Sequence, residues 1–414
     1  MLNPQNSPVK QAASSKSRNL FGACLAHILH DGYTDQLYAL LPVWQVQFCL
    51  SYMGLAMVRA LYYGTMGGLQ VSANRCSAWL KPRSALALST LVAAVGFVAM
   101  ALSTGFAGLC VGLILAGFGS SVQHPRASDL VTHSYGSESR GALGIYNFAG
   151  DLGKATLPAI VALILPVLAW RVVVGLMGLL GILVASTLLA VLPNETDSTP
   201  AHHEIERKHE TRGGFSVLLS IGVLDTATRM GYLLFLPFLI HARGGSSATV
   251  GLGLALVFVG GAFGKATCGW LGQRVGVVAS VVATEIATAG LIVVTCLTPI
   301  HAMLVFLPFL GMVLNGTSSV LYGTVPEIAP KGNTGRAFAL FYTGVIGAGG
   351  LAPIAYGAIA DHSGRMIGIL SSALTAAAIV PLVLSLRRVL SSSEGDKSMS
   401  FAFSFSSLRV LPRK

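Results

Sequence analysis

The sequence predicts an all-α polytopic membrane protein with twelve transmembrane helices arranged as two six-helix pseudo-repeats. Three observations lead to this fold class: a mean hydropathy of +0.70, a charged fraction of only 10%, and apolar runs of spanning length along the whole chain. Soluble domains carry about 25% charged residues, so a water-soluble protein of 414 residues would need far more polar surface. Composition therefore excludes a cytosolic enzyme, a nucleic-acid binder and a disordered chain.

The expected spans form two sets of six, because a helix needs about 20 mainly apolar residues to cross the hydrocarbon core. An N-terminal bundle at 20–192 and a C-terminal bundle at 215–389 are separated by a polar linker at 193–214, with polar tails at 1–19 and 390–414. The individual spans are expected at 20–47, 52–72, 84–104, 107–127, 140–165, 170–192, 215–240, 248–271, 276–297, 301–325, 336–360 and 366–389.

The positions of Lys and Arg predict the topology. Most of these 27 residues lie in the tails, the linker and the loops on one side, whereas the opposite loops hold only Arg171, Arg243 and Arg365. The positive-inside rule therefore predicts that both termini and the linker lie in the cytoplasm. The expected location of the chain is the inner (plasma) membrane. The net charge of +11 then mainly reflects topology. The basic N-terminal tail precedes an apolar segment without a small-residue cleavage site, so an uncleaved first helix is expected.

Short motifs recur in the same order in the two sets of spans. An Asp, a Tyr and a Pro occur in the first and seventh spans, a Ser-Ser-Val in the fourth and tenth, and an Arg and a Tyr at the start of the fifth and eleventh. Duplicated halves are typical of secondary transporters, whose substrate site lies where the repeats meet.

Ionisable side chains inside the expected spans are the candidate functional residues, because each costs a few kcal/mol or more at the bilayer centre. The first span contains His27, His30, Asp31 and Asp35. His27, Asp31 and Asp35 follow an i, i+4, i+8 spacing and share one helix face. Since His beside carboxylates can titrate near neutral pH, the cluster predicts a proton relay. A polar seam between two helices is the structural alternative.

Cations inside the spans predict an anion site. Arg59 in the second span is expected either to pair with an acid of the first span or to hold an anion through its planar guanidinium. The fifth and seventh spans carry the pairs Asp151–Lys154 and Asp225–Arg229, at i, i+3 and i, i+4. Such pairs either neutralise each other structurally or release one partner to a proton or a substrate charge.

The predicted site residues form two groups. Proton coupling is expected from His27, His30, Asp31, Asp35, Asp151 and Asp225. Substrate contacts are expected from Tyr38, Arg59, Gln123, His124, Tyr146, Asn147, Lys154 and Arg229. Arg126, and as an alternative reading Lys265, are assigned to the membrane interface, where long basic side chains reach water. The six scattered cysteines contain no C-x-x-C pair, so no disulfide, metal site or cofactor is expected.

The fourth span ends in the motif Gly117-Phe-Gly-Ser-Ser-Val-Gln-His124-Pro125, in which Pro125 is expected to break the helix. The polar groups freed by the break must face protein or water. The chain resembles the major facilitator superfamily here, and more narrowly its fosmidomycin-resistance branch, which has Gly-x-Gly-Ser-Ser-x-x-His-Pro at this point. In the first span, His27-Ile-Leu-His30-Asp31 is similar to that branch's His-x-x-Asn-Asp, with His30 in place of Asn.

The loop after the second span departs from the family pattern. It keeps Arg75, Lys81 and Arg83 but lacks the acidic residue of the usual cytoplasmic gating salt bridge. The resemblance implies the major facilitator fold and proton-driven export of small, often anionic, compounds.

The leading expectation is a monomeric proton-coupled antiporter that exports a small organic anion, with protons and the lipid bilayer as its other partners. A symporter that imports an organic anion uses the same residue types and stays open. A membrane-embedded enzyme or a non-transporting scaffold is a minor alternative, because the sequence contains no H-E-x-x-H, no G-x-S-x-G and no paired Cys/His ligand set. Substrate identity, direction and proton stoichiometry are not determined by the sequence.

Overall fold

The structure is a computed structural model that describes residues 8–194, 214–328 and 334–406, and every long regular element in these ranges is a helix. The helices are α1 (Pro8–Phe48), α2 (Tyr52–Gly68), α3 (Gln70–Cys76), α4 (Pro82–Leu102), α5 (Phe106–Ser120), α6 (Gln123–Tyr135), α7 (Ser139–Ile164), α8 (Trp170–Val191), α9 (Gly214–Ala242), α10 (Ser247–Val275), α11 (Val277–Leu297), α12 (Ile300–Ile328), α13 (Thr334–Ser363) and α14 (Arg365–Ser406), with the short 3₁₀ turn η2 (Gly136–Glu138) before α7. The predicted all-α class is confirmed.

Each of the twelve expected spans coincides with one of these helices, the fourth with α5 and α6 together. Nine helical stretches in the described residues are long and apolar enough to cross a membrane. Helix α2 falls short of that length with 17 residues, and α1 and α7 carry many of the polar side chains of the site. The total of twelve membrane crossings stays a prediction.

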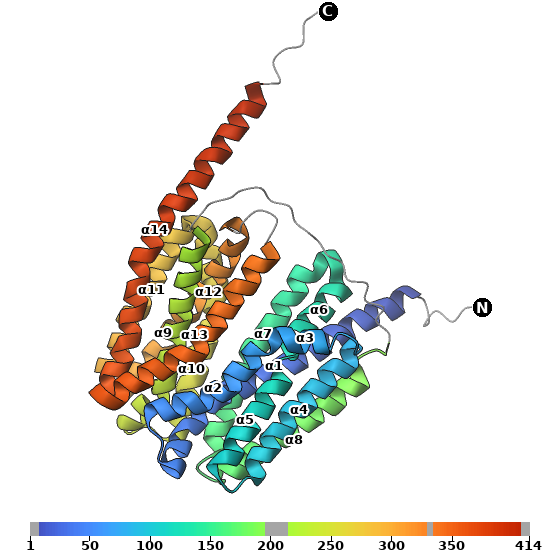
Figure 1. Ribbon diagram of the computed structural model, residues 1–414, viewed down its shortest axis with the longest axis vertical. Helices are drawn as coiled ribbons and strands as arrows, with labels where there is room; N and C mark the ends of the chain where they lie inside the picture. Colours follow the sequence, from blue (N-terminus) through green and yellow to red (C-terminus); the bar gives the residue numbers. More distant parts are fainter. Residues whose placement is uncertain (1–7, 195–213, 329–333, 407–414) are drawn as a thin grey trace, which may run out of the picture.

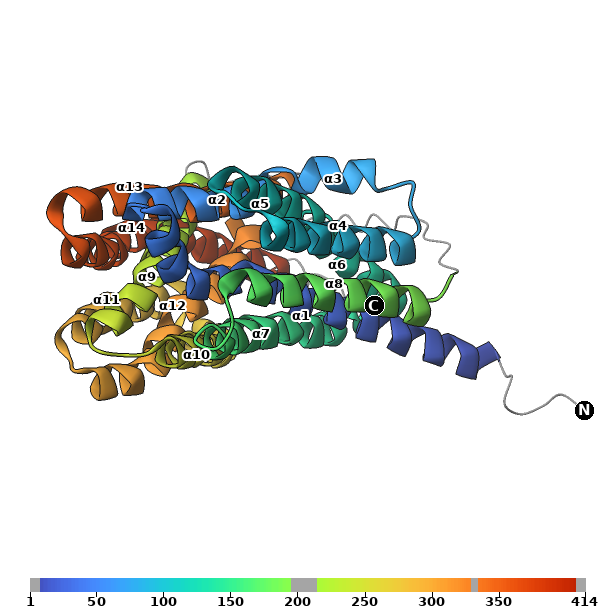
Figure 2. The ribbon, with the colours of Figure 1, turned by 90° about the horizontal axis from the view of Figure 1, so that it is seen from below.

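The helices form two groups, α1–α8 and α9–α14, that lie side by side (Figure 1). Two pairs of helices make the main contacts between the groups, α2 with α13 and α7 with α10, as the view from below shows (Figure 2). We keep the predicted domain boundaries as a proposal, because most of the linker lies outside the described residues.

Close helix packing brings polar side chains of different helices together. A Cβ atom on Gly153 of α7 would clash with the backbone carbonyl of Ile28 on α1, and one on Gly264 of α10 would clash with the carbonyl of Met312 on α12. Glycine at these positions lets the backbones approach, as small residues do in membrane bundles. Asp151 and Lys154 of α7 are thereby held against α1, and Lys265 follows Gly264 on α10.

Three helix ends differ from the expected boundaries. Helix α1 begins at Pro8, and α14 continues to Ser406, projecting beyond the bundle (Figure 1), so the predicted C-terminal tail is helical up to that residue. The break in the fourth span occurs at Ser121 and Val122, before Pro125. Pro125 lies in the first turn of α6, where its missing N–H would have no helical partner in any case, so it does not break the helix.

Candidate functional site

A cavity of about 700 Å³ lies between the two groups of helices. Polar and charged side chains line it from both sides: His27, Asp31, Asp35, His124, Tyr146, Asn147, Asp151, Lys154, Arg229, Lys265 and Asn315. It extends to Arg75 and Ser128, near the helix ends that the sequence places on the cytoplasmic side. The cavity therefore combines most of the predicted proton-coupling acids with three intramembrane cations, Lys154, Arg229 and Lys265.

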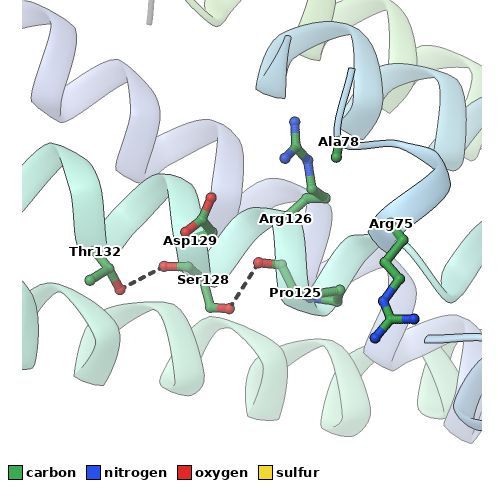
Figure 3. A pocket seen from close by; sticks show the side chains of 7 residues that line it. All are labelled: Arg75, Ala78, Pro125, Arg126, Ser128, Asp129 and Thr132. Carbon is green, nitrogen blue, oxygen red and sulfur yellow. Dashed lines mark hydrogen bonds between the residues drawn. The ribbon is translucent and has the colours of Figure 1, made fainter. Parts of the chain in front are cut away.

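A second cavity of about 560 Å³ adjoins this end and shares Arg75, Pro125 and Ser128 with the first (Figure 3). The α6 side chains Ser128 and Thr132 bond to their own helix, with Ser128 Oγ donating to the carbonyl oxygen of Pro125. Arg126 donates to the carbonyl oxygen of Leu80 at 2.5 Å, which joins α6 to the segment before α4. Hydrogen bonds to the backbone thus occupy these side chains, and we place no site here.

Asp31 is the centre of the charged cluster on the N-terminal side. Its Oδ2 lies 3.1 Å from Nζ of Lys154 and 3.2 Å from Nε2 of His27, and its Oδ1 lies 3.4 Å from Nε2 of His124. The imidazole of His27 stacks on the ring of Tyr146 at 4.0 Å between centroids. The i, i+4 spacing of His27 and Asp31 therefore produces the contact that the sequence predicts, and α6 and α7 complete the cluster.

A hydrogen-bond acceptor lies beside each ring nitrogen of His27. Its Nδ1 lies 2.8 Å from the backbone carbonyl oxygen of Tyr146, which only accepts, so Nδ1 carries a hydrogen. A neutral imidazole would then present a bare lone pair at Nε2, facing the carboxylate of Asp31 at 3.2 Å. Two lone pairs at this distance repel each other. An added proton on this pair would lie between Nε2 and Oδ2, so the geometry makes His27–Asp31 a candidate proton-binding pair.

Lys265 joins the two groups of helices by an ion pair. Its Nζ lies 2.5 Å from Oδ1 of Asp151, which is also 3.9 Å from Nζ of Lys154. The predicted i, i+3 pair within α7 is thus the longer of two contacts made by Asp151. Lys265 lines the cavity and pairs with Asp151, which favours a site role over the alternative of a side chain at the membrane interface. Its position inside an expected span was the only signal in the sequence, and it did not specify which face Lys265 occupies.

Arg59 does not make the predicted pair with an acid of α1. Among the described residues its contacts are the rings of Tyr38 and Tyr63, at 4.5 and 4.8 Å from the guanidinium carbon, together with the carbonyl oxygen of Gly349 and Sδ of Met230, both at 3.4 Å. It is 1% exposed and does not line the cavity. Arg59 therefore packs between the two groups, stabilised by aromatic faces.

Arg229 lines the cavity, and its Nε makes no hydrogen bond. Among the described residues no carboxylate lies within 4.0 Å of its guanidinium, so the predicted ion pair with Asp225 is not formed. Asp225 instead shares a side-chain hydrogen bond with Glu285 of α11. Arg229 thus faces the cavity with no carboxylate in direct contact among the described residues, and Asp225 acts on it only from one helical turn away. Such a guanidinium is a suitable group to bind an anion.

The remaining predicted residues divide between the cavity and the packed interior. Asp35, Tyr146 and Asn147 line the cavity. His30 lies inside the N-terminal group, with Nδ1 2.8 Å from Ser120 Oγ and Nε2 3.1 Å from Thr90 Oγ1. Tyr38 donates to Sδ of Met230 at 3.3 Å, and Gln123 donates to Oη of Tyr146 at 3.3 Å. These buried contacts keep His30, Tyr38 and Gln123 out of the cavity lining.

The end of the molecule opposite the cavity mouth is closed by contacts between α2 and α13. The carboxylate of Asp361 accepts the backbone N–H groups of Tyr52 at 2.8 Å and Met53 at 3.0 Å, at the N-terminus of α2. Gly357 lies one turn earlier, where a Cβ atom would come 2.7 Å from the backbone nitrogen of Met53. The site is therefore reached from one end and closed at the other.

The family model of the Major Facilitator Superfamily matches residues 20–224 and 218–412. The chain belongs to the major facilitator superfamily. It is 24% identical over 382 residues to the fosmidomycin resistance protein of Escherichia coli K12, with 87% of this chain and 92% of that protein covered. The family resemblance predicted from the sequence is thus confirmed.

Solved structures with the same fold include a bacterial homologue of the human lysosomal transporter Spinster. Its inward-facing unoccupied form has a TM-score of 0.71 at 15% identity, and its inward-facing occupied form has 0.72 at 14%; each match covers 92% of this chain and 98% of the other. Family and fold together identify a multi-pass membrane protein that is a secondary transporter of small molecules rather than an enzyme.

Proposed function

We propose that this major facilitator transporter exports a small organic anion in exchange for protons, as a monomer in the inner membrane with both termini in the cytoplasm. One observation carries the proposal: the same cavity holds the Arg229 guanidinium, which has no carboxylate within 4.0 Å among the described residues, and the candidate proton-binding pair His27–Asp31. The Arg229 guanidinium attracts an anion, and the His27–Asp31 pair gives the cavity a charge that changes when a proton binds or leaves.

Anion binding is assigned to cations from both groups of helices. Arg229 comes from α9, and Lys154 comes from α7, where its Nζ is 29% exposed while it contacts Asp31. A substrate that bridges Arg229 and Lys154 contacts both halves at once, as alternating access requires of a central site. The planar guanidinium offers two parallel N–H donors to a carboxylate or phosphate-like group.

Protonation of the His27–Asp31 pair changes the electrostatic attraction between Asp31 and the Lys154 ammonium. When the proton leaves the His27–Asp31 pair, the ionised carboxylate attracts Lys154 more strongly and competes with an anionic substrate for that ammonium. When Asp31 is protonated, this attraction is lost and Lys154 becomes available to an anion, because the other carboxylate near it, Asp151 at 3.9 Å, is paired with Lys265. The proton and the substrate are therefore linked through one lysine, and such linkage is reciprocal.

Alternating access needs the closed end to open and the cavity mouth to close. Asp361 holds the closed end, and the Asp151–Lys265 ion pair joins α7 to α10 beside the cavity. A substrate anion that draws Lys265 away from Asp151 weakens this link. Export is favoured by the Escherichia coli relative, a fosmidomycin resistance protein, since removal of a compound from the cell gives resistance.

Proton-coupled import is a second candidate that a specific contact supports. A proton on Asp31 frees Lys154 for an anion, so proton and anion binding reinforce each other at this site. Mutual reinforcement is what a symporter needs, whereas an antiporter needs the two occupancies to alternate between opposite conformations. The contacts of Lys154 therefore support import, whereas the case for export comes from the Escherichia coli relative.

Transport by proteoliposomes distinguishes the mechanisms. The solutes are fosmidomycin and a panel of labelled carboxylates and organophosphates, first selected by thermal stabilisation of the purified protein. Under antiport, uptake is driven when the lumen is more acidic than the bath; under symport, it is driven when the bath is more acidic. The test variant is Asp31→Asn. Its matched control is Glu138→Gln, the same acid-to-amide type of change on the exposed turn before α7. If the protein exchanges labelled solute in counterflow but neither direction of the proton gradient drives accumulation, proton coupling is refuted. If no solute of the panel is exchanged at all, anion transport is refuted for this panel.

A further inference from the structure

Two carboxyl groups that do not line the cavity are buried together in the C-terminal half. Asp225 of α9 is 3% exposed, Glu285 of α11 is 1% exposed, and a side-chain hydrogen bond joins them. The second oxygen of Glu285, Oε1, has no hydrogen-bond partner. Carboxylates only accept hydrogen bonds, so a carboxyl–carboxyl bond requires a proton on one of the two groups.

In the part of the chain that the structure describes, one cation acts on the pair, and the phenol of Tyr322 on α12 also lies near Asp225. Arg229 lies one turn further along α9, and its charge acts on Asp225. Helix α12 contributes Thr317, whose single hydroxyl hydrogen is shared between Glu285 and Oγ1 of Thr284, the latter at 2.8 Å. The stretch 366–386 of α14, which packs on both α9 and α11, contains no titratable residue. One carboxylate is therefore balanced by Arg229, whereas a second would be buried without a counter-charge.

The internal repeat relates the Asp225–Glu285 pair to the Asp31 cluster of the N-terminal half. Asp225 occupies the place in α9 that Asp31 occupies in α1, each seven residues before a Tyr and eleven or twelve before a Pro. In the N-terminal half Asp31 contacts His27 at 3.2 Å, and in the C-terminal half Asp225 shares a hydrogen bond with Glu285. Equivalent positions in the two halves thus both place a carboxyl group against a second titratable side chain.

We infer that Asp225 and Glu285 form a second proton-binding site, separate from the His27–Asp31 pair, in which one proton is shared between two carboxyl groups and the remaining negative charge balances Arg229. A further proton on this site removes that counter-charge, so the guanidinium of Arg229 then attracts an anion more strongly. Only this last link rests on the proposed function, since the proton site itself needs no substrate.

Infrared spectroscopy of the full-length protein in detergent at neutral pH tests the proton directly. The difference spectrum between the parent and Glu285→Gln should show the loss of one protonated-carboxyl C=O stretching band. The glutamine amide donates to Asp225 in place of the acid proton, so the variant should fold and keep its Tm. Asp361→Asn is the control, because it removes an exposed acid that accepts two backbone N–H groups, and it should remove no such band.

A pH series supplies a second readout. The parent holds a proton that the unfolded chain has released, so its Tm should fall as the pH rises until that proton is lost. The Tm of Glu285→Gln should lack this component. An equal protonated-carboxyl band in the parent and in Glu285→Gln, or identical dependence of their Tm on pH, would overturn the inference. Should Glu285→Gln fail to fold, Asp225→Asn is measured in the same way.

The link to Arg229 has its own measurement. The double variant Asp225→Asn/Glu285→Gln leaves Arg229 without a counter-charge, so it should bind an anion of the panel more tightly than Glu285→Gln does. Equal affinities would remove the link and leave the proton site. If no variant binds any anion, the proposed function fails while the infrared result stands.

Discussion

Asp361 holds the closed end of the transporter, and its removal should open that end. Its two carboxylate oxygens accept the first two N–H groups of α2, at 2.8 and 3.0 Å, from the opposite half of the molecule. The first N–H groups of a helix have no partner inside the helix, so Asp361 supplies what the backbone of α2 lacks. Asp361→Ala removes both hydrogen bonds and leaves the rest of α13 in place.

The expected size of the effect follows from these two hydrogen bonds. Each is worth about 1 kcal/mol at an exposed position, where water replaces a lost partner. Asp361→Ala should therefore shift the equilibrium between closed and open outer ends by about 2 kcal/mol, or about 30-fold. Asp361→Asn keeps one acceptor oxygen, so its shift should be about 1 kcal/mol, or about fivefold.

Hydrogen–deuterium exchange at the amides of Tyr52 and Met53 measures this equilibrium at the hydrogen bonds themselves. Both amides should exchange about 30-fold faster in Asp361→Ala. Ser51→Ala is the matched control: Ser51 Oγ accepts the N–H of Gly54 at 3.2 Å, so this change frees an amide of the same turn without touching the other half. Unchanged exchange at Tyr52 and Met53 in Asp361→Ala would refute the reasoning.

Three further predictions concern the cavity. Asp31→Asn should abolish proton-driven uptake but keep part of the counterflow, and full gradient-driven uptake in this variant would move the proton site elsewhere. Arg229→Ala should weaken anion binding about 10- to 100-fold in the protein that folds. Arg59→Ala should lower the Tm and the yield of folded protein, because Arg59 is 1% exposed, and the folded fraction should still bind the anion. Loss of anion affinity in Arg59→Ala with unchanged affinity in Arg229→Ala, measured by calorimetric titration, would exchange their roles. A double-mutant cycle of Lys265→Ala and Asp151→Asn, read by denaturant unfolding, should give a coupling of about 1 kcal/mol, and strict additivity would mean that the ion pair is not formed.

The candidate site was predicted best where its residues share one helix. The spacing of His27 and Asp31 fixes their positions on a single face of α1, and the contact appears at 3.2 Å. Prediction failed where an intrahelical pair had to compete with a partner on another helix. Asp225 and Arg229 have the i, i+4 spacing of an ion pair, yet Asp225 bonds to Glu285, sixty residues later in the chain.

The sequence also did not predict how each helix is rotated about its axis, and therefore which of its side chains face the cavity. Arg59 and Lys265 are both single cations in apolar spans, and nothing in their neighbours indicates which of them faces water. Packing turns Arg59 onto the rings of Tyr38 and Tyr63 and turns Lys265 into the cavity. The free energy that decides between these orientations comes from contacts with other helices, which a single span does not contain.

The sequence by itself determined the all-α fold class, the approximate positions of the helices, the family, and the face of α1 that bears His27 and Asp31. Each of these depends on composition or on local periodicity, which the chain carries within a few turns. Only the tertiary structure decided which cations reach the cavity, which acids bond to each other, and that Asp361 closes one end. These depend on atoms that are distant in the chain, because in a membrane bundle a buried charge takes the partner that helix packing brings nearest.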